Sequence, residues 1–312
     1  MSQNKVLDGL MGLCVADALG VPVEFTSREV LKKNPVTDMR GYGTYNQPPG
    51  TWSDDSSLAF CLAESLINGL NYNDIADKFV RWLYEGYWTP YGDVFDVGTT
   101  TSEAIMNLRN GIEPTKAGPD GYYNISNGSL MRILPLAFYL QDKDIKTQFE
   151  VSHDVSRITH GHPRVLVAVA IYIQYAINLL KGQNPKEAYQ NMQQTVLEYY
   201  SNHEFAGELK HFDRILHNDI STYPEDEIQS TGYAVASLEA ALWAFLNSKD
   251  YADAALKAVN LGDDTDTVGA IAGGLAGIYY GYENIPKKWI ALIPRKDDII
   301  DLANRLNQAL NK

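Results

Sequence analysis

The chain has 312 residues, a formal charge of −13 and a hydrophobic content of 45%, an ordinary composition for a globular protein with a full core. This acidic balance argues against nucleic acid or an anionic membrane as a partner, because both need clustered Lys and Arg. Cys14 and Cys61 stand in apolar stretches without metal-type spacing, so we expect core thiols in a cytoplasmic protein. We expect one domain over residues 1–312 and favour a monomer.

Apolar residues recur at helical spacing from the N-terminus onward. The first stretch is interrupted by Asp17 and stopped by Gly20 and Pro22, which suits neither a signal peptide nor a membrane span. Further helices are expected at residues 56–69, 74–86, 100–110, 129–140, 145–157, 163–181, 186–201, 205–217, 233–247, 250–260, 266–280 and 297–310. No stretch alternates convincingly as a strand, so the expected fold class is all-α.

Residues 163–181 form the most apolar of these stretches. They open with Pro163, a residue that favours the first turn of a helix, and are apolar almost all round. This pattern predicts a central buried helix, although the β-branched content leaves a buried strand as an alternative. The long connections at 27–50, 87–98, 111–127 and 218–230 are rich in Gly, Pro, Asn, Asp or Tyr, and such loops are where a site is built.

Two acidic turns carry the chemistry. The first, GTWSDDSS at 50–57, places Ser53, Asp54 and Asp55 at the start of a predicted helix, where simple capping is the alternative to a functional role. The second, LGDDTDT at 261–267, contains Asp264, Asp266 and Thr267 and leads into a helix rich in glycine. Those glycines weaken a helix, a cost that makes sense if the helix packs very close to its neighbours.

If the two turns meet, their carboxylates repel each other by up to roughly 4 kcal/mol per pair at about 4 Å and an effective dielectric of 20. Divalent cations remove that penalty, and carboxylate and hydroxyl oxygens are the ligands that Mg²⁺ or Mn²⁺ prefers. The spacing fits neither an EF-hand loop nor a zinc site. The sequence therefore predicts a binuclear, oxygen-ligated metal centre.

Six motifs in order resemble the ADP-ribosylglycohydrolase family over roughly residues 5–285. They are GLCVADALGVPVE at 12–24, GTWSDDS at 50–56, FDVGTT at 95–100, SNGSLMR at 126–132, THGHP at 159–163 and GDDTDT at 262–267. The family usually has threonine where this chain has Ser53 and Ser56. Because a serine hydroxyl can still ligate, we expect activity with a slightly looser site.

The resemblance implies an all-α hydrolase, folded as a compact orthogonal helical bundle. It would hold two Mg²⁺ or Mn²⁺ ions and cleave the glycosidic bond between ADP-ribose and an acceptor. The substrate would be an ADP-ribosylated protein, most readily at arginine, or a small ADP-ribosyl compound. By motif position the metal ligands would be Ser53, Asp54, Asp55, Asp264, Asp266 and Thr267. Glu24 matches an acidic residue that gates the metal centre in some relatives; a solvent-facing loop carboxylate is the alternative.

Within this reading a carboxylate must handle the proton, and Glu24, Asp54 and Asp55 are the candidates, while Asp96 holds the acceptor side or the ribose. The glycine-bearing turn at 124–132 enters a predicted helix whose free amides could hold a pyrophosphate. The remaining substrate-binding residues that we expect are Thr100, Asn127, Gly128, Ser129, Met131, His160 and Tyr233. We favour His160 over His162 and expect the Tyr233 ring against the adenine or the distal ribose.

Two other functions remain open on the sequence. A catalytically silent protein of the same fold would bind ADP-ribose without turning it over. A dinuclear phosphoesterase or pyrophosphatase would use paired aspartate turns for phosphoryl displacement.

Overall fold

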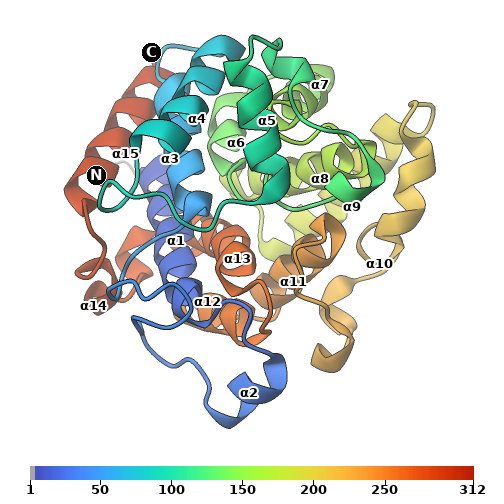
Figure 1. The fold of residues 1–312 in the computed structure, drawn as a ribbon. Helices are drawn as coiled ribbons and strands as arrows, with labels where there is room; N and C mark the ends of the chain where they lie inside the picture. The colour runs from blue at the N-terminus through green and yellow to red at the C-terminus, as the bar shows by residue number, and fades with distance from the viewer. Residues whose placement is uncertain (1–3) are drawn as a thin grey trace.

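A computed structural model describes residues 4–312, and the all-α prediction is confirmed. Within this range there is no strand, only an isolated bridge between Ser126 and Tyr233. The helices are α1 Lys5–Gly20, α2 Arg28–Lys33, α3 Asp54–Leu66, α4 Tyr72–Glu85, α5 Thr99–Arg109, α6 Leu134–Leu140, α7 Ile145–Arg157, α8 Pro163–Leu180, α9 Pro185–Tyr200, α10 Asp213–Leu216, α11 Ala234–Leu246, α12 Tyr251–Asn260, α13 Thr265–Tyr280, α14 Lys287–Ile290 and α15 Lys296–Leu310. Figure 1 shows α1 and α13 in the interior with the other helices around them.

Helices α1 and α13, from opposite ends of the chain, form the central pair. A Cβ at Gly12 would lie 2.5 Å from the Gly273 carbonyl oxygen, and one at Gly277 would lie 2.1 Å from the Asp8 carbonyl oxygen. The glycines of α13 therefore allow backbone-to-backbone contact, as the sequence predicted. A Cβ at Gly20 would lie 2.4 Å from the Asp266 Cα, so the end of α1 touches the start of α13.

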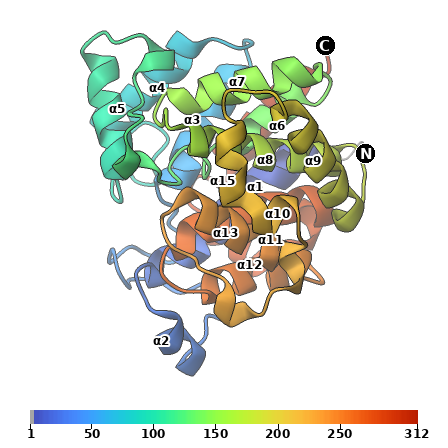
Figure 2. The same ribbon diagram turned by 90° about the vertical axis from the view of Figure 1, so that its right-hand side faces the viewer.

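Helix α8 is buried over almost its whole length, which confirms the central helix and makes the strand alternative wrong. Figure 2, a view turned by 90°, shows it running through the upper half of the molecule. Within residues 4–312, two segments could cross a membrane by length and hydropathy, Lys5–Val23 and Pro163–Leu180, but 89% and 78% of these windows are buried inside the protein. Both belong to the core of this fold. Cys14 and Cys61 are buried free thiols, as expected.

Three parts of the helix prediction were wrong. The predicted helix at 129–140 begins only at Leu134. Residues 126–132 form a turn, and Pro135 favours a position in the first turn of the helix. The stretch at 205–217 is a 3₁₀ helix, Ala206–Phe212, followed by the single turn of α10. The short helices α2 and α14 lie in segments for which we expected no helix.

Candidate active site

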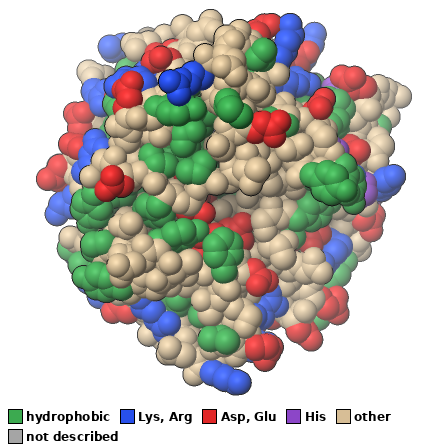
Figure 3. Space-filling model, viewed as in Figure 1, with side chains coloured by type: hydrophobic (Ala, Val, Ile, Leu, Met, Phe, Trp, Pro, Cys, Tyr) green, Lys and Arg blue, Asp and Glu red, His purple; other side chains and the backbone are tan. Residues whose placement is uncertain are grey.

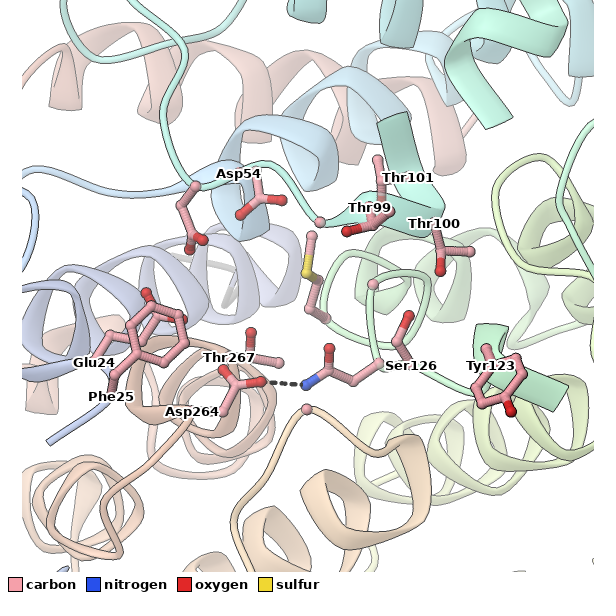
Figure 4. A pocket seen from close by; sticks show the side chains of 16 residues that line it. Glu24, Phe25, Asp54, Thr99, Thr100, Thr101, Tyr123, Ser126, Asp264 and Thr267 are labelled. Atoms are coloured by element: carbon pink, nitrogen blue, oxygen red, sulfur yellow. Dashed lines mark hydrogen bonds between the residues drawn. The ribbon is translucent and has the colours of Figure 1, made fainter. Parts of the chain in front are cut away.

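A cavity of about 320 Å³ opens on the face shown in Figure 3, where acidic side chains lie in a central hollow. Six chain segments meet at it: the residues after α1, the starts of α3, α5 and α13, and the turns around residues 126–131 and 232. The lining residues are Glu24, Phe25, Asp54, Asp96, Gly98, Thr99, Thr100, Thr101, Tyr123, Ser126, Asn127, Gly128, Met131, Gly232, Asp264 and Thr267. Figure 4 shows the carboxylates toward one end of the cavity and threonine and serine hydroxyls toward the other.

The first acidic turn begins α3, and its residues divide into capping and site roles. Ser53 is the N-cap, and its hydroxyl accepts from the Asp55 amide at 3.3 Å and donates to Asp55 Oδ2 at 2.7 Å. Asp54 lines the cavity, whereas Asp55 lies beneath it, fully buried. Capping therefore explains Ser53, but it accounts neither for Asp54 at the cavity nor for Asp55 Oδ1, which has no hydrogen-bond partner.

Asp17 on α1 holds this turn from below. Its carboxylate accepts from the Ser53 amide at 3.1 Å, from the Ser56 amide at 3.1 Å and from the Ser56 hydroxyl at 2.5 Å. A negative group among the free amides of a helix N-terminus is favourable. Asp17 thereby fixes α3 against α1.

The second acidic turn is not a cap of the ordinary kind. Asp264 is the N-cap residue of α13, but its side chain makes no capping hydrogen bond. Instead its Oδ2 accepts from Asn127 Nδ2 at 2.8 Å, the contact drawn in Figure 4. Thr265 Oγ1 donates to the Gly20 carbonyl at 2.8 Å, which ties this turn to the end of α1. The Asp264 carboxylate thus faces the cavity.

The two turns meet, and their carboxylates form two overlapping groups. Ligand oxygens of Asp17, Asp55 and Asp266 lie within 4.8 Å of one another, as do those of Glu24, Asp264 and Asp266. Asp266 belongs to both groups. The arrangement offers two adjacent positions for a cation, with one carboxylate shared between them.

Burial and mutual repulsion disfavour the charged carboxylates in the absence of a cation. Burial, reinforced by the Asp96 charge, raises the pKa of Glu24 to about 9. Burial likewise raises the pKa of Asp17 to about 7, against hydrogen bonds from Ser53 and Ser56 that lower it. The pKa values of Asp54, Asp55, Asp264 and Asp266 are also raised, first by burial. None of the lining residues is Lys or Arg, so the lining supplies no compensating charge.

The residues fit a pair of hard divalent cations. Three buried oxygens, Glu24 Oε2, Asp55 Oδ1 and Asp266 Oδ2, have no hydrogen-bond partner. Unpaired buried carboxylate oxygens are costly, and ligation would satisfy those of Asp55 and Asp266. The donor set is purely oxygen, as Mg²⁺ and Mn²⁺ prefer. Thr267 lies beside it at the cavity wall.

The other end of the cavity is polar but carries few charges. The first turn of α5 supplies Thr99, Thr100 and Thr101, and its N-cap Gly98 makes no side-chain capping bond. A Cβ at Gly128 would lie 2.7 Å from His160 Cε1, so only glycine allows the 126–131 turn to pack on that ring. The helix that we expected at 129–140 begins only at Leu134, which does not line the cavity, so the first turn of α5 is the better source of free amides.

Of the expected substrate-binding residues, Asp96, Thr100, Asn127, Gly128 and Met131 line the cavity. Ser129, His160 and Tyr233 do not. Ser129 is buried with its hydroxyl 2.8 Å from that of Ser156, and the Tyr233 hydroxyl accepts from Arg164 at 3.2 Å. His160 is fully buried behind Ser126, while His162 is the N-cap of α8.

Several lining residues were not expected from the sequence, among them Ser126, Phe25 and Tyr123. Asp17 was expected only to interrupt an apolar stretch. A single carboxylate inside an otherwise apolar helix was the available signal, because such a group is buried only where donors surround it. Glu24 is buried, so the alternative of a solvent-facing loop carboxylate is wrong.

Fold and site together define an all-α protein with a buried carboxylate cluster on the floor of a ligand-sized cavity. All of residues 1–312 match the model of the ADP-ribosylglycohydrolase family, and the chain belongs to that family. It is 35% identical over 317 residues to a Serratia proteamaculans protein named ADP-ribosylarginine hydrolase Tri1, covering 98% of this chain and 79% of that one.

Two further matches are similar over nearly the whole chain. A Rhodospirillum rubrum glycohydrolase named for ADP-ribosyl-dinitrogen reductase is 29% identical over 297 residues, covering 94% of this chain and 91% of that one. A solved structure described as an ADP-ribosylglycohydrolase-related protein complex has a TM-score of 0.83 and 30% identity, covering 99% of this chain and 98% of that one. The fold of this chain is therefore the fold of the family.

Proposed function

We propose that this protein is a metal-dependent hydrolase that releases ADP-ribose from ADP-ribosylated arginine. The observation that carries the proposal is the pair of overlapping carboxylate groups that share Asp266 at the floor of the cavity. Family membership and the names of the relatives support the ADP-ribosyl substrate.

Two Mg²⁺ or Mn²⁺ ions are the proposed cofactors. Asp55, Asp264 and Asp266 would hold them, and Ser53 beside Asp55, with Asp54 or Thr267 at the cavity wall, would complete the shell. When bound, such a pair supplies Lewis acidity, which polarises the ribose hydroxyls and a water at the anomeric carbon. Asp17 keeps the first acidic turn in place through its bonds to Ser53 and Ser56.

Glu24 is the carboxylate best placed to move a proton. It lines the cavity, and its Oε2 is buried without a hydrogen-bond partner. Asp54 also lines the cavity, whereas Asp55 lies below the floor and is a poorer candidate. In this assignment Glu24 Oε2 carries the proton between water and the leaving acceptor, and Asp96 orients the ribose or the acceptor.

The hydroxyl-rich end suits the pyrophosphate. An anion bound at this end would have no Lys or Arg side chain to pair with. It would instead accept hydrogen bonds from the first-turn amides of α5 and from the hydroxyls of Thr99, Thr100 and Thr101. Tyr123, 94% exposed at the same end, offers an aromatic ring to the adenine.

The carboxylate end suits a cationic acceptor. Phe25 follows Glu24 directly, lines the cavity and is 70% exposed, so its ring is available at the mouth. A planar guanidinium is attracted both by carboxylates and by an aromatic face. These contacts favour arginine over a neutral serine acceptor.

The test is ADP-ribose release from an ADP-ribosylarginine peptide and a matched ADP-ribosylserine peptide, with Mn²⁺ or Mg²⁺ present. We expect release from the arginine peptide and its loss on chelation. Mass analysis of the products separates the rivals, because a phosphoesterase would release phosphate or a nucleoside monophosphate. Tight ADP-ribose binding without any release would instead identify a silent binding protein and overturn the proposal.

A further inference from the structure

Arg132, the last residue of the 126–132 turn, is buried without a carboxylate partner among the ion pairs of the described chain. It is 0% exposed, and its Nε and Nη1 have no hydrogen-bond partner. Its Nη2 donates to Thr159 Oγ1 at 2.7 Å and to the Val155 carbonyl at 3.3 Å, while the guanidinium lies 4.5 Å from the centre of the Phe79 ring. Burying a guanidinium with unpaired N–H groups costs free energy, so packing alone does not explain why Arg132 is buried here.

A chain of side chains leads from Arg132 to the cavity. Thr159 Oγ1 lies 3.0 Å from His160 Nδ1, and His160 Nε2 lies 2.8 Å from Ser126 Oγ. Thr159 and His160 are both fully buried, whereas Ser126 lines the cavity at its hydroxyl-rich end. The close packing of Gly128 on the His160 ring holds the chain against the same turn.

The donor at the start of this chain sets its direction. A guanidinium only donates, so Thr159 Oγ1 accepts from Arg132. A hydroxyl that accepts from a cation becomes a better donor, which favours donation from Thr159 to His160 Nδ1. A neutral His160 then carries its hydrogen on Nε2 and donates it to Ser126 Oγ. Burial and the Arg132 charge lower the pKa of His160 to about 3, consistent with the neutral ring.

We propose that Arg132, Thr159 and His160 are positioning residues that turn the Ser126 hydroxyl into a hydrogen-bond donor for the phosphate end of an anionic ligand. Because Ser126 Oγ accepts from the ring, its own hydrogen is free to point into the cavity. Through this series of hydrogen bonds Arg132 polarises the Ser126 hydroxyl at the cavity wall. The positive charge itself stays away from the proposed cation positions. This inference rests on the proposed function for the identity of the ligand.

The first test uses the unmodified protein. Nitrogen NMR of histidine-labelled protein reports which ring nitrogen of His160 carries the hydrogen, with Ser126→Ala used to assign the resonance. The proposal requires a neutral ring with hydrogen on Nε2. A ring with hydrogen on Nδ1 would reverse the direction of every bond in the chain and overturn it.

The second test measures ADP-ribose binding by calorimetry and the kinetics of ADP-ribosylarginine hydrolysis. Thr159→Val keeps the shape of the side chain but removes the hydroxyl, and we expect Kd and KM to rise about tenfold with kcat nearly unchanged. Thr159→Ser should restore wild-type values. Ser126→Ala should match Thr159→Val, and the double variant should be no worse than either, because both remove the same interaction.

A buried hydroxyl elsewhere provides the matched control. Ser152 in α7 donates to the Gln148 carbonyl at 2.6 Å, and Ser152→Ala should leave ADP-ribose affinity unchanged. The proposal would be overturned if the losses of ADP-ribose affinity added up in the double variant, or if Thr159→Val had an unchanged Kd. Arg132 would then have a structural role only. If the wild type binds ADP-ribose but releases it from no substrate, the proposed function fails, while the NMR and binding results still decide this inference.

Discussion

At the scale of single residues, His153 shows how burial fixes a charge state. It is 3% exposed, its Nε2 lies 2.6 Å from the Tyr200 hydroxyl, and its ring contacts those of Phe149 and Phe205. Burial, with smaller contributions from Arg157 and His203, lowers its pKa to about 3. The folded protein therefore keeps His153 neutral at a pH where the unfolded chain protonates it.

The stability that this residue contributes is complete above about pH 6.5 and is lost as the pH falls toward about 3, since the unfolded state binds more protons in that window. In this window the free energy of unfolding changes with pH by up to about 1.4 kcal/mol per pH unit because of this residue. We expect His153→Phe to reduce the difference in free energy of unfolding between pH 7.5 and 5.0 by up to about 2 kcal/mol.

Urea unfolding at the two pH values measures this difference, and other titrating groups cancel in the comparison between variants. The exposed His217, changed to Asn, is the control and should leave the difference as in the wild type. An identical pH dependence in wild type and His153→Phe would contradict the account.

The role of a residue was predictable from the sequence only where neighbouring residues in the sequence indicated it. The acidic turns were recognisable as a candidate site because Asp54 and Asp55 are adjacent and only Thr265 separates Asp264 from Asp266. Asp17 did not, because its task depends on α3, a segment far along the chain that folds back onto α1. Ser129 was assigned to the ligand because its motif at 126–132 resembles that of the family, but its side chain turns toward Ser156 instead.

At the scale of elements, the pairing of α1 with α13 places Asp17, Glu24 and Asp266 in one cluster. Gly12 lies at the crossing, where an added Cβ would be 2.5 Å from the Gly273 carbonyl oxygen and 2.8 Å from the Gly277 Cα. Both neighbours are backbone atoms, so neither can rotate away. We expect Gly12→Ala to lower the free energy of unfolding by about 1–3 kcal/mol, as overpacked cores do.

Chemical denaturation measures the loss, and Gly207→Ala is the matched control. Nothing lies within 4 Å of a Cβ at Gly207, so this variant should stay within about 0.5 kcal/mol of the wild type. Equal stability of the two variants would show that the helices can separate at no cost, contrary to the packing described.

Long helices were predictable from periodicity, whereas short ones were not. Stretches such as α7 and α8 were predicted to within a residue, because their apolar faces persist over several turns. Helix α2 spans only Arg28–Lys33, too short for a period to show. The late start of α6 follows from the buried turn that ends at Arg132, whose path is set by tertiary contacts with Thr159 and Val155.

At the scale of the whole molecule, folding brings carboxylates from three separate stretches of the chain together at the floor of one cavity. Two of these stretches lie in the first quarter of the chain and one lies in the last quarter. Periodicity cannot predict that meeting, since it depends on the order in which the helices pack. The family resemblance implied it, and the proximity of Gly20 to Asp266 provides its physical basis. The cluster stores repulsion that bound cations would relieve.

Cation binding should therefore stabilise the fold. One cation at about a hundred times its Kd adds about 2.7 kcal/mol, which corresponds to a rise in Tm of about 4 °C for a chain of this size. Thermal unfolding with Mn²⁺ and with a chelator measures the shift. An unchanged Tm at saturating Mn²⁺ would mean that the cluster takes no cation.

The stoichiometry of bound Mn²⁺, counted by equilibrium dialysis and elemental analysis, tests the shared cluster most directly. Asp266 belongs to both carboxylate groups, whereas Asp55 belongs to one. The account predicts two ions per wild-type chain, one after Asp55→Asn and essentially none after Asp266→Asn, with all three chains folded by circular dichroism. Two ions retained by Asp266→Asn would contradict it.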